Sequence, residues 1–91
     1  MMKLGTVIGT VWATRKEAGL KGLKFLFVQL EDPHGQPVDT PLIAVDQIGA
    51  GVGDRVIITQ GSSSRFVFSE HNVPIDAVII GIVDSIDIEG R

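Results

Sequence analysis

The sequence predicts an all-β fold, a single small domain built as either a closed barrel or a sandwich. Short runs rich in β-branched and aromatic residues alternate with segments rich in Gly, Pro and Asp, a pattern typical of strands and turns. No apolar pattern at helical spacing lasts more than a turn or two. The 91 residues match the length of one domain, which can bury a core without disulfides or metals.

Five strands are expected along the chain, with at most one short helical turn, near Asp76. The first four have the approximate bounds Leu4–Ala13, Leu23–Leu30, Leu42–Val45 and Arg55–Gln60, and the fifth starts near Ala77 and ends no later than Ile88.

The segments between these strands have the composition of tight turns. Residues 32–35 combine a Pro, which presets φ, with a Gly, which accepts positive φ. Residues 49–54 form a glycine-rich bend, and residues 61–65 place three serines and an arginine after the fourth strand. The chain contains no linker or repeat, so residues 1–91 are expected to form one domain. Residues 88–91 match a protease recognition sequence, and we interpret them as either a natural tail or a remnant of an added tag.

The strands are apolar on both faces, which indicates self-association. In the second strand Leu23, Phe25 and Phe27 share one face, and an equally apolar set shares the other: Leu26, Val28 and Leu30. A strand with one face in water alternates apolar and polar residues. A barrel has one interior, and no helix is expected to cover its outside. The outer apolar faces are therefore predicted to pack against another copy of the chain.

Composition argues against several functional classes. The net charge of −3, from 8 basic and 11 acidic residues, contrasts with the basic excess usual in nucleic-acid-binding proteins. There is no Cys, and His34 and His71 lie far apart, so we predict no metal site and no cofactor. The segment Gly49–Gly53 lacks the Lys and Ser/Thr of a phosphate-binding loop.

Catalysis and membrane insertion are not expected either. The serines of 62–64 together with His71 could form a small hydrolytic site, but the nucleophile elbow that such a site needs is missing. No apolar run approaches the roughly 18–20 residues of a membrane span, and the N-terminus lacks the apolar stretch of a signal peptide. We therefore predict a protein with no catalytic residues that does not insert into membranes and is located in the cytoplasm.

Two segments are candidate contact surfaces. Arg65 follows a serine-rich turn, and a planar guanidinium that makes several bonds is common at interfaces. The predicted subunit interface consists of Gly49, Gly51, Gly53, Ser62, Ser63 and Arg65. A second segment is basic, with Arg15, Lys16, Lys21 and Lys24. This basic segment is either a solvated loop or a docking surface for an acidic protein.

Several segments together resemble the EutN/CcmL family of microcompartment vertex proteins. They are GTVWATRK (9–16), LKGLK (20–24), AVDQIGAGVG (44–53), GSSSR (61–65), PIDA (74–77) and GIVD (81–84). They follow the family's order and spacing over nearly the whole chain. The sequence departs from the family at Ser64, Arg55 and Phe25, where alanine, tryptophan and leucine are usual.

The resemblance implies an OB-like barrel that assembles as a cyclic ring, a homopentamer rather than a hexamer, at the corner of a polyhedral shell in the bacterial cytoplasm. Its partners would be hexameric shell proteins, because a flat hexagonal net needs five-fold units to close. The residues Arg15, Lys16 and Lys21 would then dock onto those hexamers. This role is structural, with no catalysis and no cofactor.

The alternative is an OB-fold protein that binds single-stranded nucleic acid. Such proteins combine a basic groove with exposed aromatic rings. The net charge argues against it, and Phe25 and Phe27 are expected in the core because they lie in the most apolar run.

Overall fold

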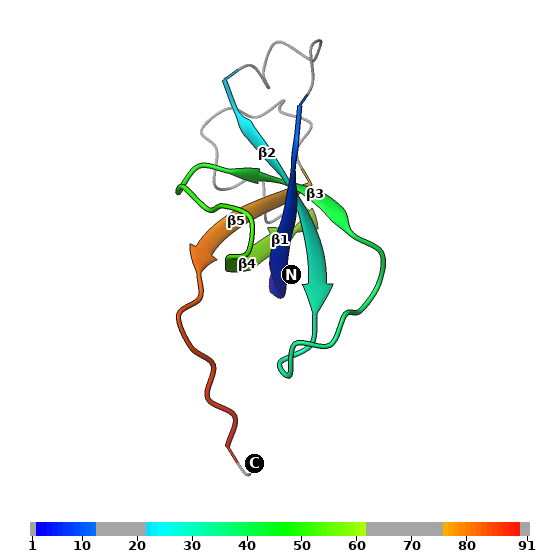
Figure 1. Cartoon of the computed structure of the whole chain (residues 1–91), viewed down its shortest axis with the longest axis vertical. Helices are drawn as coiled ribbons and strands as arrows, with labels where there is room; N and C mark the ends of the chain where they lie inside the picture. The colour runs from blue at the N-terminus through cyan, green and yellow to red at the C-terminus, as the bar shows by residue number, and fades with distance from the viewer. Residues whose placement is uncertain (1, 13–21, 62–75, 90–91) are drawn as a thin grey trace.

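A computed structural model of the chain describes residues 2–12, 22–61 and 76–89, and shows a closed five-stranded barrel (Figure 1). The strands are β1 (Met2–Val11), β2 (Lys24–Glu31), β3 (Leu42–Asp46), β4 (Arg55–Gln60) and β5 (Ala77–Ile82). They close in the order β1-β2-β3-β5-β4, with β4 pairing back onto β1. Only the β3–β5 pair is parallel. The all-β prediction is confirmed, and of its two forms the barrel is the one adopted.

The last strand is shorter than its predicted limit. β5 ends at Ile82, and residues 83–89 leave the barrel as a tail (Figure 1). The expected end of the first strand, Ala13, lies outside the described residues. The other strand bounds agree with the sequence prediction to within two residues.

The barrel interior is filled by aliphatic side chains from every strand. Its members include Val7, Leu26, Val28, Ala44, Val56, Ile58 and Ile79, each at most 1% exposed. The alternation predicted for the second strand is confirmed, since Leu26, Val28 and Leu30 all point inward. Burying such side chains supplies the main driving force for folding, at roughly 25 cal/mol per Å² of apolar surface.

The prediction that Phe25 and Phe27 lie in the core is wrong. Phe27 is 38% exposed on the outside of the barrel, and Phe25 is only partly buried. Phe25 packs with Leu23 against a separate small cluster formed by Val45 and Val78. The interior is taken by the alternate residues Leu26 and Val28, and period-two geometry then forces both rings outward.

Closure brings β1 very near β2 at Gly5. A Cβ atom added there would lie 2.6 Å from Val28 Cγ1 and 2.8 Å from the Gln29 carbonyl oxygen. Further along, the β1–β2 register shifts between Val7 and Gly9, which marks a bulge. Bulges bend a strand and increase its twist, as a small barrel requires.

Candidate assembly interface

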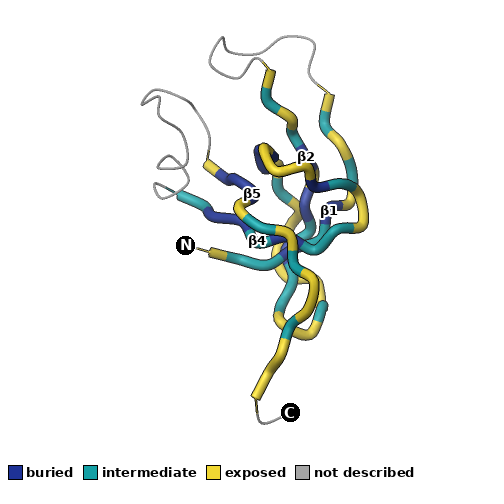
Figure 2. Tube along the Cα trace, turned by 90° about the vertical axis from the view of Figure 1, so that its left-hand side faces the viewer, coloured by how far each residue is buried: buried dark blue, intermediate teal, exposed yellow. Residues whose placement is uncertain are grey.

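The outside of the barrel carries apolar side chains across neighbouring strands. Phe27 of β2 and Ile43 of β3 are register partners, 38% and 52% exposed. On the other side Phe27 pairs with Gly9 of β1, which follows the exposed Ile8. Figure 2 shows how exposed segments alternate with buried ones along the strands. The prediction that the strands are apolar on both faces is thus confirmed for β2.

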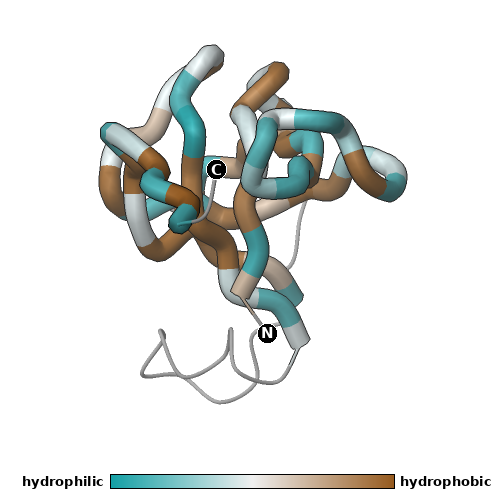
Figure 3. The backbone as a smooth tube through the Cα atoms, turned by 90° about the horizontal axis from the view of Figure 1, so that it is seen from below, coloured by the Kyte–Doolittle hydropathy of each residue, from teal (hydrophilic) through white to brown (hydrophobic). Residues whose placement is uncertain are grey.

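Viewed from the end where the tail leaves, hydrophobic stretches occur on several sides of the chain (Figure 3). Large apolar side chains exposed by more than a third include Met2, Ile8, Trp12, Val38, Ile48, Val52, Ile80 and Ile82. Contiguous exposed apolar surface on a small protein usually marks an interaction site.

The bend between β3 and β4, residues 47–54, is held in place by specific contacts, and we call it the built loop. Ala50, fully buried, anchors it in the core. The Gly53 amide donates to the Val7 carbonyl at 2.9 Å, and the Val7 amide donates to the Asp54 carbonyl at 2.9 Å. Inside the loop the Gly51 amide donates to Asp54 Oδ2 at 2.8 Å. These contacts fix the loop while leaving Ile48 and Val52 exposed.

Gly49 and Gly53 are needed in this loop for their backbone conformation. Their φ angles are +90° and +94°, in the region that favours glycine. A Cβ at either position would meet nothing within 4 Å in this chain. The loop therefore has open space around its glycines, into which a second chain can approach.

An ion pair between a buried carboxylate and a half-exposed lysine supports the same loop. The Asp46 side chain is 1% exposed, and its Oδ2 lies 3.5 Å from Lys24 Nζ. Lys24 Nζ also donates to the Ala50 carbonyl at 2.7 Å, and the Ile48 amide donates to Asp46 Oδ1 at 3.1 Å. A carboxylate removed from water needs a nearby cation. The basic side chain of Lys24, which the sequence placed in a basic loop segment, instead positions the bend.

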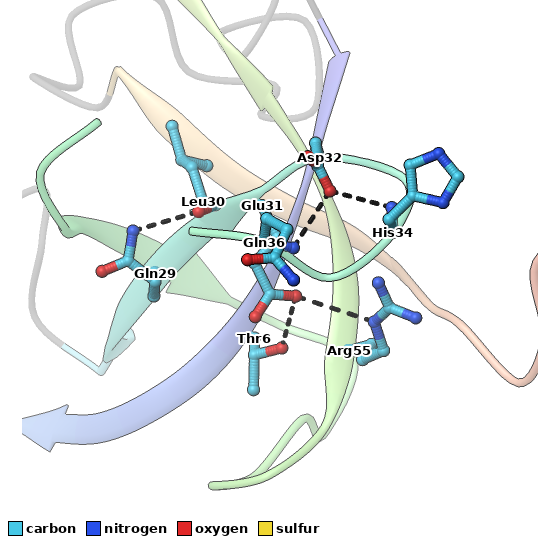
Figure 4. A network of polar contacts seen from close by, with 8 residues as sticks. All are labelled: Thr6, Gln29, Leu30, Glu31, Asp32, His34, Gln36 and Arg55. Atoms are coloured by element: carbon cyan, nitrogen blue, oxygen red, sulfur yellow. Dashed lines mark hydrogen bonds and ion pairs between the residues drawn. The ribbon is translucent and has the colours of Figure 1, made fainter. Parts of the chain in front are cut away.

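A polar cluster covers another part of the outer surface, where β1, β2 and β4 meet (Figure 4). Glu31 Oε1 accepts a hydrogen bond from Thr6 Oγ1 at 2.8 Å and lies 3.7 Å from Arg55 Nε. Arg55 occupies a position where the family resemblance predicts tryptophan. Here its guanidinium compensates the Glu31 carboxylate.

The turn after β2 is held by the carboxylate of Asp32 (Figure 4). Asp32 Oδ1 accepts hydrogen bonds from the amides of Gln36 at 3.0 Å and His34 at 2.8 Å. The hydrogen bond from the Gln36 amide is the largest effect holding the pKa of Asp32 below its ordinary value; desolvation, the next largest, raises it, and the amide and charge of His34 lower it further. This confirms the predicted turn at 32–35.

The described part of the chain has hollows on its surface, of which two bear on assembly. The first, about 530 Å³, is lined mainly by apolar residues of β1, β2, β4 and the 33–39 loop: Met2, Lys3, Leu4, Leu30, Glu31, Pro33, Val38, Asp39 and Ile57. The second, about 390 Å³, lies at the end of the β1–β2 hairpin and is lined by residues 10–12 and 22–25. Trp12 at its edge is 88% exposed.

The structure places only some of the residues predicted for contacts. Gly49, Gly51 and Gly53 lie together on the built loop, and their part in a subunit interface remains a prediction. The other candidates lie outside the described residues, and their roles also remain predictions: Ser62, Ser63, Arg65, Arg15, Lys16 and Lys21. Ile48 and Val52 were not predicted as contact residues, although an apolar residue in a glycine-rich bend is a usable signal for a loop that another chain covers.

Among the described residues, no cluster of three or more His, Cys, Asp or Glu side chains could hold a metal ion. In the same part of the chain, no helix has the length and apolar character needed to cross a membrane.

The comparison with known proteins gives consistent matches. Residues 2–84 match the family described as "Ethanolamine utilisation protein EutN/carboxysome". The chain is 41% identical over 90 residues to the carboxysome shell vertex protein CcmL of Gloeobacter violaceus, covering 99% of this chain and 90% of that protein. It is 40% identical over 85 residues to the microcompartment shell vertex protein EutN of Escherichia coli, covering 93% and 90%.

A solved structure of a similar protein has the same fold as this chain. The GrpN pentameric microcompartment shell protein from Rhodospirillum rubrum superposes with a TM-score of 0.83 at 40% identity, covering 94% of this chain and 96% of that one.

Proposed function

The chain belongs to the EutN/CcmL family of shell vertex proteins, and we propose that five copies of it form a ring that closes a corner of a polyhedral bacterial microcompartment. The observation that carries this proposal is the apolar outer surface of a barrel that already has a complete core. Phe27, Ile43, Ile48 and Val52 are exposed, while a separate set of aliphatic side chains fills the interior. Such groups gain most by packing against a neighbour.

A five-fold ring constrains the contact. Five identical subunits cannot pair through one self-complementary patch, so each must present two different surfaces that meet head to tail and close. The barrel offers two such regions, the built loop of 47–54 and the outer face of β2 and β3. We propose that Gly49, Gly51, Gly53, Ser62, Ser63 and Arg65 line this junction.

The ring supplies curvature and performs no reaction. Hexameric tiles form flat sheets, and a closed polyhedron needs five-fold units at its corners. We propose hexameric shell proteins as the second partner, the shell within the bacterial cytoplasm as the location, and the loop with Arg15, Lys16 and Lys21 as the docking segment. The alternative, single-stranded nucleic-acid binding, is not supported, because the similar proteins are shell vertex proteins.

Two measurements test the proposal. Native mass spectrometry at micromolar concentration should give a mass of five chains, and a clean monomer would contradict the ring. Hexameric shell proteins produced without this chain, in cells lacking any paralogue, should give sheets, tubes or shells with open corners in electron micrographs. Adding the chain should give closed particles. Identical closed particles in both cases would exclude a vertex role.

A further inference from the structure

The C-terminal tail, residues 83–89, is placed to contact something other than its own barrel. The Val83 amide donates to the Arg55 carbonyl at 2.8 Å. Beyond that bond, no hydrogen bond or ion pair joins 84–89 to the rest of the described chain. Figures 1 and 2 show the tail running away from the strands. Beyond Val83, the described part of the chain therefore holds the tail by no polar contact, which leaves it available to a neighbouring molecule.

The end of the tail alternates apolar and acidic residues. In an extended chain successive side chains point in opposite directions, so from Ser85 onward Ile86 and Ile88 share one side, and Ser85, Asp87 and Glu89 share the other, while nearer the barrel Asp84 falls on the side of the isoleucines. Ile86 is partly buried and Ile88 is exposed. Such a segment is suited to lie on an apolar surface with its carboxylates in water.

The larger hollow provides a surface of this kind. Its apolar lining consists of Met2, Leu4, Leu30, Pro33, Val38 and Ile57, and no tail residue contributes to it. The tail thus leaves the hollow of its own chain unfilled. Lys3 and Asp39 at the hollow carry opposite charges, and Glu31 is compensated by Arg55. Apolar packing, rather than net charge, would therefore select what binds there.

Length favours a neighbouring copy as the occupant. Residues 83–89 span about 23 Å when extended, at roughly 3.3 Å per residue. The two shorter dimensions of the molecule are 24 and 22 Å. The tail therefore reaches about as far as one protomer is wide, which brings it over the next subunit of a ring.

We infer that the tail is an arm that packs Ile86 into the hollow of the adjacent copy. This inference rests on the proposed ring and names a contact within it. Each protomer would give one arm and receive one, which is the head-to-tail arrangement that a closed ring requires.

A disulfide experiment distinguishes the possible occupants. The chain has no Cys, so Val38→Cys combined with Ile86→Cys places the only two thiols, one in the hollow and one on the arm. After mild oxidation, a non-reducing denaturing gel should show a ladder of cross-linked chains up to the pentamer. Each single variant should give at most cross-linked pairs.

Three other outcomes overturn the arm contact. A single band whose thiols are joined within one chain would place the arm in its own hollow. A monomer band with free thiols, from a sample that native mass spectrometry shows to be pentameric, would reject the arm while leaving the ring intact. A sample monomeric by native mass spectrometry would reject both.

A second pair of variants guards against misfolding of the double-cysteine protein. Ile86→Asp places a charge on the apolar side of the arm and should weaken the ring by about tenfold or more, because it removes a buried aliphatic side chain from the contact. Ser85→Asp adds the same charge on the opposite side and should leave the dissociation constant within about twofold. Equal effects of the two variants, with unchanged circular dichroism, would overturn the inference.

Discussion

Lys24 and Asp46 are register partners across the β2–β3 ladder, with Lys24 Nζ 3.5 Å from Asp46 Oδ2. The same ammonium group donates to the carbonyl of Ala50, the residue that anchors the exposed bend in the core. One side chain thus neutralises a buried carboxylate and positions a loop proposed for assembly. The barrel and its contact surface are coupled through this pair.

Lys24→Met should destabilise the protein because it leaves the buried Asp46 carboxylate without its cation. The loss should be about 1–3 kcal/mol, below the value for a fully buried pair because the lysine is half exposed. Urea unfolding at one fixed protein concentration measures it. Adding Asp46→Asn, which removes the charge and keeps an oxygen for the Ile48 amide, should restore part of the loss. Additive losses would show that the two groups are uncoupled.

Gly5→Ala should also destabilise the barrel. The new Cβ would lie within 3 Å of Val28 Cγ1 and the Gln29 carbonyl oxygen. The carbonyl oxygen belongs to the backbone of β2, so it cannot shift aside as the end of a flexible side chain can. Overpacking of this kind costs about 1–3 kcal/mol. Gly9→Ala is the matched control on the same strand, since its Cβ would have 3.8 Å to Phe27 Cβ. The midpoints of thermal or urea unfolding should fall for the first variant and change little for the second.

Much of this fold could be predicted from short stretches of sequence. Alternation within a strand determines which side chains share a face, and turn residues determine where the strands end. Alternation in β2 identified Leu26, Val28 and Leu30 as a set, and turn residues such as Gly53 identified the bend. Long-range relationships could not be obtained in this way. The partner of Lys24 is 22 positions away (46 − 24), among neighbours that made Lys24 look like part of a basic loop. The close approach at Gly5 depends on where β2 crosses β1.

The misplacement of Phe25 and Phe27 has the same origin. Both faces of β2 are apolar, and hydrophobicity alone does not say which of two apolar faces is inside. The aliphatic face fills the barrel, and Phe27 is left exposed on the outer face, where a second chain could cover it. The exposure that contradicted the core prediction therefore supports the assembly proposal.

The turn after β2 should show a pH-dependent contribution from Asp32. Its pKa in the folded state is lowered, chiefly by the hydrogen bond from the Gln36 amide. Because the pKa of Asp32 is lower in the folded state, the ionised carboxylate stabilises the folded protein fully at a pH above its pKa in the unfolded state, about 4. This stabilisation is lost as the pH falls through the pKa of the folded state. The stability difference between wild type and Asp32→Asn should therefore be constant from pH 5 to 7, values about one unit or more above that pKa, and shrink below about pH 4. A difference that grows on acidification would contradict this assignment.

Val52→Asp should weaken the ring without unfolding the barrel. Val52 is 66% exposed on a loop held by backbone bonds between Gly53 and Val7, so its side chain contributes little to the fold of one chain. If a neighbouring subunit covers it, a carboxylate there has to be desolvated without a partner, and a central interface position costs about 2 kcal/mol, or about 30-fold in the dissociation constant. Gel filtration over a dilution series should show earlier dissociation, while circular dichroism stays unchanged. The control is Thr40→Asp, which puts the same charge at an exposed polar residue outside the built loop and outside β2 and β3. If Val52→Asp rings dissociate at the same concentration as wild type, the bend is not covered in the ring and the subunit junction has to lie on the outer face of β2 and β3 alone.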